Sequence, residues 1–99
     1  MEPTQALEKL DLVVGRIREA GPHPGARAPS YLLRIDLGGR GTREASIEAG
    51  AYDAAELVGS QVVCGARGDE ILVLAARSRA HGIVLLRPDR EVENGTAIG

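Results

Sequence analysis

The chain has 99 residues and a formal net charge of −2, and 43% of its residues are hydrophobic but only 2% aromatic. This length fits one domain, which we expect to cover residues 1–99. The charge excludes a protein that holds nucleic acid by bulk charge alone. No apolar run approaches the roughly 20 residues that span a bilayer, so we expect no membrane partner.

The N-terminal residues and the cysteine content indicate the compartment. The chain begins without the basic and apolar regions of a signal peptide. Cys64 is the one cysteine, so no internal disulfide can form, which fits a reducing compartment. We therefore expect a cytoplasmic protein.

Residues 4–10 predict a short amphipathic helix. Ala6, Leu7 and Leu10 form its apolar stripe, and the charged residues between them face water. A helix of this length is not stable alone, so we expect it to pack against another surface.

The next segments predict β-strands. Residues 12–20 are rich in β-branched side chains and end at a segment of Gly and Pro. Residues 31–37 alternate apolar and polar side chains, with Leu33 and Ile35 on the apolar face. A weaker strand over residues 42–47 follows a glycine-rich turn.

The second half of the chain predicts a helix and a hairpin. Asp53 and Glu56 have the spacing of a capping box, so a brief helix should begin at Asp53 and end at Gly59. Residues 61–66 and 70–76 predict two strands joined by a tight turn. A further apolar segment and two turns lead to the C-terminus.

Five strands with a helix between the third and fourth match an OB-type Greek-key barrel, an all-β fold. A five-stranded SH3-like barrel is the alternative, but it would not require a helix at that place. The aliphatic side chains of the strands should fill the barrel. The predicted core consists of Tyr31, Leu33, Ile35, Val62, Leu72, Leu74 and Val84.

The sequence does not assemble a catalytic or metal-binding set. His23 and His81 have no ligand-type residue three or four positions on, so no metal site is predicted. Cys64 lies inside an apolar strand, where an inert buried thiol is favoured over a nucleophile. We predict a binding module that has no catalytic residues and no cofactor, and that is not an enzyme.

Arginines are the best candidates for a binding surface, because the planar guanidinium suits phosphate and carboxylate groups. Residues 15–43 contain six arginines and two acids, a local excess of +4. Ordinary solvated surface charges are the alternative interpretation. The candidate RNA-binding residues are Arg16, Arg18, Arg27, Arg34, Arg43 and Arg67.

Six segments carry a resemblance to a known family. The segments are LDLVVGRI (10–17), HPGARAPSY (23–31), IDLG (35–38), LVGSQVV (57–63), EILVL (70–74) and GIVLLRPDREVENG (82–95). They resemble the CsaA-type proteins, stand-alone relatives of the tRNA-binding OB domain that is appended to some tRNA synthetases. The resemblance implies an OB-fold homodimer that binds tRNA or, in the CsaA branch, unfolded or precursor peptides as an export chaperone.

Two segments depart from the family pattern. The third strand is Ser-Ala-Gln-Ile-like in the family, whereas this chain places Glu44 and Glu48 there. The family also carries an Asn-Phe-Pro-Pro-Arg-like loop between strands four and five that lines its binding site. Residues 64–69 replace that loop with a shorter connection, and Asp69 stands where relatives have a serine. The departure predicts that inherited RNA binding is weakened or retargeted.

We therefore expect a non-catalytic, homodimeric tRNA- or RNA-binding module. A peptide-binding, chaperone-like protein and a structural dimer without RNA binding are the alternatives. In a dimer, the N-terminal stripe and the tail around Val92 and Ile98 would pack across the two-fold axis. The alternative to this dimer is that the N-terminal helix closes one end of its own barrel. RNA binding requires arginines gathered on one face, whereas a peptide binder requires an apolar groove beside a polar rim.

Overall fold

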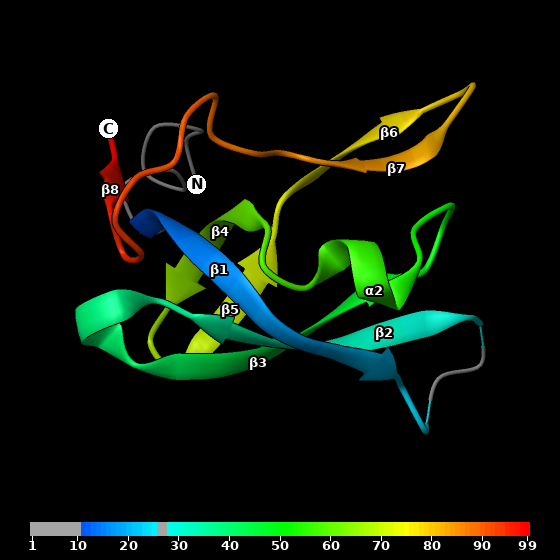
Figure 1. Cartoon of the computed structure of the whole chain (residues 1–99), viewed down its shortest axis with the longest axis horizontal. Coiled ribbons are helices and arrows are strands. Elements are labelled where there is room, and N and C mark those ends of the chain that lie inside the picture. The colour runs from blue at the N-terminus through cyan, green and yellow to red at the C-terminus, as the bar shows by residue number, and fades with distance from the viewer. Residues whose placement is uncertain (1–10, 26–27) are drawn as a thin grey trace, which may run out of the picture.

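The computed structural model of the chain describes residues 11–25 and 28–99, so the helix predicted over residues 4–10 lies outside the described part. Figure 1 shows a mostly β molecule whose main sheet curls into a nearly closed barrel. This OB-like architecture confirms the all-β prediction. Within the described residues, no helix is long and apolar enough to cross a bilayer.

One antiparallel sheet, in the order β3-β2-β1-β4-β5, makes up the barrel, with β8 added beside β1. β1 pairs with β4 along its first half and with β2 along its second, and a register shift after Ile17 lets it bend between them. The strands are β1 (Asp11–Pro22), β2 (Ser30–Asp36), β3 (Thr42–Glu48), β4 (Gln61–Arg67), β5 (Glu70–Val73), β6 (Ala75–Ser78), β7 (Gly82–Leu85) and β8 (Ala97–Ile98).

Two short helical turns connect the strands. The 3-10 turn η1 (Gly38–Arg40) joins β2 to β3, and the helix α2 (Ala54–Leu57) lies between β3 and β4. At the start of α2, the backbone N–H of Asp53 donates to Oε1 of Glu56 at 2.8 Å, which satisfies a donor that the helix leaves free. Leu57 is fully buried, so α2 is anchored in the barrel core.

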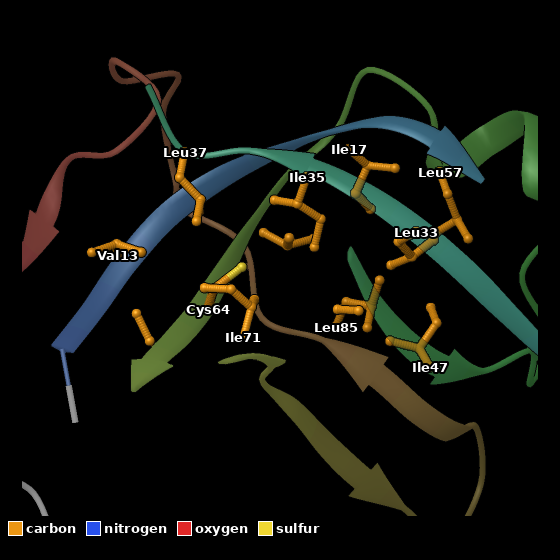
Figure 2. Close-up of a cluster of buried hydrophobic side chains, with 13 residues drawn as sticks. Val13, Ile17, Leu33, Ile35, Leu37, Ile47, Leu57, Cys64, Ile71 and Leu85 are labelled. Carbon is orange, nitrogen blue, oxygen red and sulfur yellow. The ribbon is translucent and has the colours of Figure 1, made fainter. Parts of the chain in front are cut away.

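The core is aliphatic, as predicted, and three of the seven predicted core residues lie fully inside it. Leu33, Ile35 and Val62 have no exposed surface, and Figure 2 shows the first two among the buried side chains of the barrel. Cys64 is also buried, and burial raises the pKa of its thiol to about 11. This environment agrees with the expectation of an inert thiol.

The prediction was wrong for the facing of two later strands. Leu72 is 64% exposed and Val84 is 38% exposed, whereas their neighbours Ile71, Ile83 and Leu85 are buried. Where consecutive residues are all apolar, either alternate set of side chains could face the core. A shift by one residue then turns every side chain to the other face of the sheet. The two remaining predicted residues, the tyrosine of β2 and the leucine after β5, are only partly buried.

The strand predicted over residues 70–76 is in fact two strands that separate at Leu74. The N–H of Leu74 donates to the carbonyl oxygen of Val63 at 3.0 Å, while its own carbonyl accepts from the N–H of Leu86 at 3.1 Å. The chain thus leaves β4 and continues as β6, which among the described strands pairs with β7 alone. Figure 1 shows these two strands projecting from the barrel as a ribbon, here called the β6–β7 ribbon.

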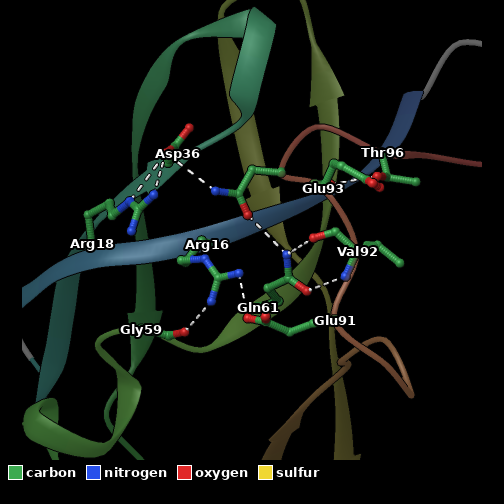
Figure 3. Close-up of polar contacts among 10 residues, drawn as sticks. Arg16, Arg18, Asp36, Gly59, Gln61, Glu91, Val92, Glu93 and Thr96 are labelled. Carbon is green, nitrogen blue, oxygen red and sulfur yellow. Dashed lines mark hydrogen bonds and ion pairs between the residues drawn. The ribbon is translucent and has the colours of Figure 1, made fainter.

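Residues 91–98, here called the C-terminal strap, are fastened along β1 and β4. Gly95 donates to the carbonyl of Val14 at 2.7 Å, and Val14 donates to the carbonyl of Thr96 at 2.9 Å. The side-chain amide of Gln61 donates to the carbonyl of Val92 at 2.6 Å and accepts from its N–H at 3.1 Å. Figure 3 shows this amide between β4 and the strap.

Candidate nucleic-acid interface

Arg16 and Arg18 lie on the outer face of β1, where both are engaged in internal contacts (Figure 3). Nη1 of Arg16 donates to the carbonyl of Gly59 at 2.8 Å, and its Nη2 forms an ion pair with Glu91 of the strap. Arg18 donates to Asp36 through Nη2 at 2.9 Å and Nε at 3.2 Å. These two guanidinium groups tie β1 to neighbouring segments and are already partnered.

Asp36 is the acid at the centre of this arrangement. Its Oδ1 accepts from the backbone N–H of Gly38 at 2.8 Å, and its Oδ2 accepts from Arg18 and from Nδ2 of Asn94. The hydrogen bond from Gly38, followed by that from Arg18, lowers the pKa of Asp36 below its ordinary value of 3.8. The carboxylate therefore remains charged at neutral pH and neutralises Arg18.

Arg34 points outward from β2 and is also surrounded by acids. Its Nη1 is 4.0 Å from Glu19 of β1, and Glu44 of β3 stands directly opposite it in the sheet register. The ion pair is solvent-exposed, so it contributes little to stability. With a carboxylate on either side, this arginine offers little net positive charge to a polyanion.

Arg43 and Arg67 lie at the barrel end that carries the β4–β5 turn. Arg43 is 4.0 Å from Asp69, the last residue of that turn. Arg67 immediately precedes the turn, is exposed, and forms no ion pair within the described residues. A hollow of about 350 Å³ opens beside them, and its lining includes Arg40 and Gly68.

The turn itself agrees with the predicted tight hairpin. Arg67 and Glu70 pair in register, so only Gly68 and Asp69 connect the two strands. Gly68 has φ +60°, a left-handed conformation that glycine adopts without strain. A connection of two residues leaves no projecting loop at this end of the barrel.

The predicted arginines thus divide among three places and do not form one basic face. On β1, Arg16 contacts the turn after α2 and the strap, and Arg18 contacts the acid at the end of β2. Arg34 lies on the outer face of β2, and Arg43 and Arg67 flank the β4–β5 turn. The sixth predicted residue, Arg27, lies outside the described residues. Folding places acids beside several of these arginines, and a count of charges along the sequence cannot show which arginines are paired in this way.

The β6–β7 ribbon carries cations that the sequence interpretation missed. Arg77 lies on β6 and donates to Glu48 at 3.1 Å, and Arg79 is exposed in the turn between the ribbon strands. Arg87, just after β7, stands 6.0 Å from the centre of the Tyr52 ring, a cation–π distance. The available signal was the charge of residues 71–88, which include three arginines and no Asp or Glu.

The two tyrosines are partly buried and their hydroxyl groups are occupied. The hydroxyl of Tyr31 donates to the carbonyl of Tyr52 at 2.7 Å, and the hydroxyl of Tyr52 accepts from the N–H of Leu85 at 3.0 Å. Stacking on aromatic rings contributes about 1–3 kcal/mol per base in single-strand binding. With so few rings, contacts with RNA would depend mainly on arginine and phosphate.

The described residues thus form an OB-like barrel whose exposed arginines are scattered over its surface. Among residues 11–25 and 28–99, no group of three or more His, Cys, Asp or Glu side chains is placed to hold a metal ion. No protein-family model matches the chain.

The structure is similar over its full length to two solved CsaA proteins. The TM-score is 0.87, with 28% identity, for the CsaA chaperone protein of Picrophilus torridus, which is covered completely. It is 0.83, with 32% identity over 99% of that chain, for the chaperone CsaA of Bacillus anthracis strain Ames. With this identity and coverage, the chain belongs to the CsaA family.

Three further similarities involve methionyl-tRNA synthetase or a protein related to it. The chain is 35% identical over 99 residues to methionine–tRNA ligase of Leptospira biflexa and 36% identical over 98 residues to that of Thermococcus kodakarensis. It spans only 14% and 13% of those enzymes. A MetRS-related protein of Pyrococcus horikoshii has a TM-score of 0.78 at 17% identity, which shows a shared fold.

Proposed function

We propose that the protein is a non-catalytic, cytoplasmic module that binds tRNA or a similar RNA through arginine–phosphate contacts. The observation that supports this most directly is the alignment of 90% of the chain with a segment of methionine–tRNA ligase, an enzyme that acts on tRNA. The protein would act as one domain over residues 1–99, with affinity set by its few available cations.

Within this proposal, four arginines contact phosphates. Arg43 and Arg67 act at the β4–β5 turn, and Arg79 and Arg87 act on the ribbon, because each has at most one carboxylate beside it, at 4.0 Å, within the described residues. Arg34 is not among them, because it lies between Glu19 and Glu44. Arg27 remains a candidate contact. The arginines already bonded to Asp36 and Glu91 hold the fold together instead.

The same arrangement supports weak binding. Four phosphate contacts correspond to a slope of about −3 to −4 in a plot of log K against log salt, because each contact contributes about −0.7 to −0.9. Arginine–phosphate contacts carry little sequence information, so we expect modest discrimination among RNAs. The net charge of −2 adds no general attraction.

Filter binding of bulk tRNA over a salt series tests the proposal. Arg67→Gln and Arg79→Gln should each weaken binding and make the salt slope less negative by about one contact. Arg90→Gln serves as the matched control, because Arg90 is exposed beside Asp89 and is not a proposed contact. No tRNA binding at low salt, or a slope unchanged in both test variants, would overturn the proposal.

The short β4–β5 connection offers a second test. We infer that its two-residue turn weakens RNA binding, since the family's longer loop at this place lines the binding site. Replacing Gly68 and Asp69 with a family-like loop should then increase tRNA affinity. Unchanged affinity in a folded graft would show that the length of this connection does not limit binding.

We also propose that the protein is a homodimer. Ile98 is 40% exposed on β8, although isoleucine is usually buried, and residues 4–10 carry a second apolar stripe. Packing these groups across a two-fold axis would remove both from water. Sedimentation should show a dimer for the wild type and soluble monomers for Leu7→Asp. A monomeric wild type at micromolar concentration would refute the dimer.

A further inference from the structure

A hollow of about 430 Å³ lies over β1, β2 and β3 on the outer face of the sheet. This volume falls in the range of about 300–1,000 Å³ that is typical of small-molecule sites. Within the described residues, the hollow shares no lining residue with the one beside the β4–β5 turn, and none of the proposed phosphate contacts lines it. It is therefore a separate feature of the surface, here called the β1–β3 hollow.

Three charged side chains form a row across the β1–β3 hollow. The strand register places Glu19 of β1 opposite Arg34 of β2, and Arg34 opposite Glu44 of β3. The Cβ atoms of such neighbours are about 4.5–5.5 Å apart, so adjacent members of the row can contact one ligand. The row presents hydrogen-bond donors in the middle and acceptors on both sides.

Two members of this row have unused hydrogen-bonding capacity. Nη1 of Arg34 is 4.0 Å from Oε2 of Glu19, which is too far for a hydrogen bond. Glu44 forms no ion pair among residues 11–25 and 28–99. With one positive and two negative charges, the row repels a phosphate group and favours a neutral ligand that both donates and accepts hydrogen bonds.

An apolar surface lies beside the row, two residues along the strands and therefore on the same face of the sheet. Here Gly21 of β1 pairs with Leu32 of β2, and both line the hollow. Leu32 is partly buried, and a Cβ at Gly21 would meet no atom within 4 Å, so the space next to Leu32 is open. A flat ring can lie on Leu32 with one edge directed at the charged row.

We propose that the β1–β3 hollow binds an unpaired guanine base of an RNA strand. Guanine alone among the four RNA bases presents two adjacent acceptors, N7 and O6, followed by two adjacent donors, N1–H and the N2 amino group. The guanidinium of Arg34 donates to N7 and O6, and the carboxylate of Glu44 accepts from N1–H and N2–H. The ring packs on Leu32. Each of the other three bases can form at most three of these four hydrogen bonds.

This guanine site rests on the proposed RNA binding and deepens it. Contacts to phosphate position a nucleic acid but carry no sequence information, whereas contacts to base edges specify it. The hollow thus supplies a readout that the arginines of the β4–β5 turn and of the ribbon cannot provide. Its acidic row also separates the two kinds of contact, since phosphates are attracted to those arginines and repelled here.

Labelled oligouridine strands with one central guanosine, adenosine or cytidine are the probes, and fluorescence anisotropy gives their affinities. The guanosine strand should bind at least about tenfold more tightly than the other two, which is the discrimination expected of a bidentate contact. A strand with central inosine, which lacks the N2 amino group, should bind more weakly than the guanosine strand. Equal affinity for all central bases would overturn the guanine site and leave RNA binding intact.

Two variants test the residues of the site. Glu44→Gln should abolish the preference for guanosine, because an amide offers one acceptor oxygen where the carboxylate offers two. Gly21→Val should also abolish it by filling the space beside Leu32, and Gly21 does not have the left-handed conformation that would strain a side chain. Preference retained in both variants would overturn the site.

Two further variants are the controls, and both should keep the preference for guanosine. Glu70→Gln is matched to Glu44→Gln, because Glu70 is exposed, forms no ion pair within the described residues and lies outside the β1–β3 hollow. Arg67→Gln should weaken binding of all the strands alike, since it removes a phosphate contact. Loss of the preference in Glu70→Gln would place base recognition elsewhere and overturn the site.

Free guanosine monophosphate distinguishes failure of this site from failure of RNA binding. Its amide NMR shifts should be confined to β1, β2 and β3 and centred on Leu32 and Arg34, and adenosine monophosphate should cause none there. If these shifts occur but tRNA does not bind, the RNA proposal fails and the free nucleotide is the source of the guanine. No shifts from guanosine monophosphate, or equal shifts from both nucleotides, would overturn the guanine site even if tRNA binds.

Discussion

Ile71 and Leu72 are adjacent in β5 but face opposite sides of the sheet, and alanine substitutions at the two positions test that facing. Ile71 is 9% exposed and packs in the core, whereas Leu72 is 64% exposed. Ile71→Ala removes three buried carbon atoms, worth about 2.4 kcal/mol at ~0.8 kcal/mol each. The cavity left behind adds to this, so we expect a loss of about 2–4 kcal/mol.

Leu72→Ala removes the same number of carbon atoms but from a side chain that is largely in water. Only about a third of its transfer free energy is at stake, so the expected loss is below about 1 kcal/mol. Urea unfolding followed by circular dichroism gives both values, and equal m-values would show that the substitutions changed stability alone. A loss at Leu72 equal to or larger than that at Ile71 would refute the assigned facing.

Three further predictions concern the core, the strap and the loss of folding stability at low pH. Leu33→Ala, at a site with no exposed surface, should reduce the free energy of unfolding by about 2–5 kcal/mol in the same urea assay. Gly95→Ala should destabilise the protein by at least about 1–3 kcal/mol, because Gly95 has φ +90° and a Cβ there would strike backbone; Gly39→Ala, which meets no neighbour, is the unstrained control. The N–H of Gly38 lowers the pKa of Asp36, so stability from this carboxylate is present above pH 3.8 and is lost as pH falls through the lower folded-state pKa. The free energy of unfolding of Asp36→Asn should therefore fall less steeply on acidification than that of the wild type. An unchanged pH dependence in acid would contradict the assignment.

Local sequence determined the positions of most elements. Asp53 and Glu56 identified the start of a helix because a capping box acts within one turn. Gly68 identified the hairpin turn because only its own backbone conformation is involved. In the second strand, alternation of apolar and charged residues also settled the facing of Leu33 and Ile35, since only one phase buries no charge.

Tertiary structure alone decided the facing of residues 71–74 and 83–86 and the separation of β5 from β6. Both segments are apolar on either side, so burial of one face depends on which neighbouring strand reaches it. At Leu74 the deciding contacts are backbone hydrogen bonds to Val63 and Leu86, which lie far away in the sequence. No local preference of Leu74 itself encodes such a junction.

The candidate site depended on tertiary structure in the same way. The sequence identified arginine as the residue type, but the availability of each guanidinium depends on carboxylates and carbonyls that folding places beside it. Arg16 is engaged by Gly59 and Glu91, and Arg18 by Asp36, whereas Arg79 of the ribbon keeps its exposure. Electrostatic pairing acts over a few ångströms in space, irrespective of separation along the chain, and so only the folded structure determines which charges remain free to bind.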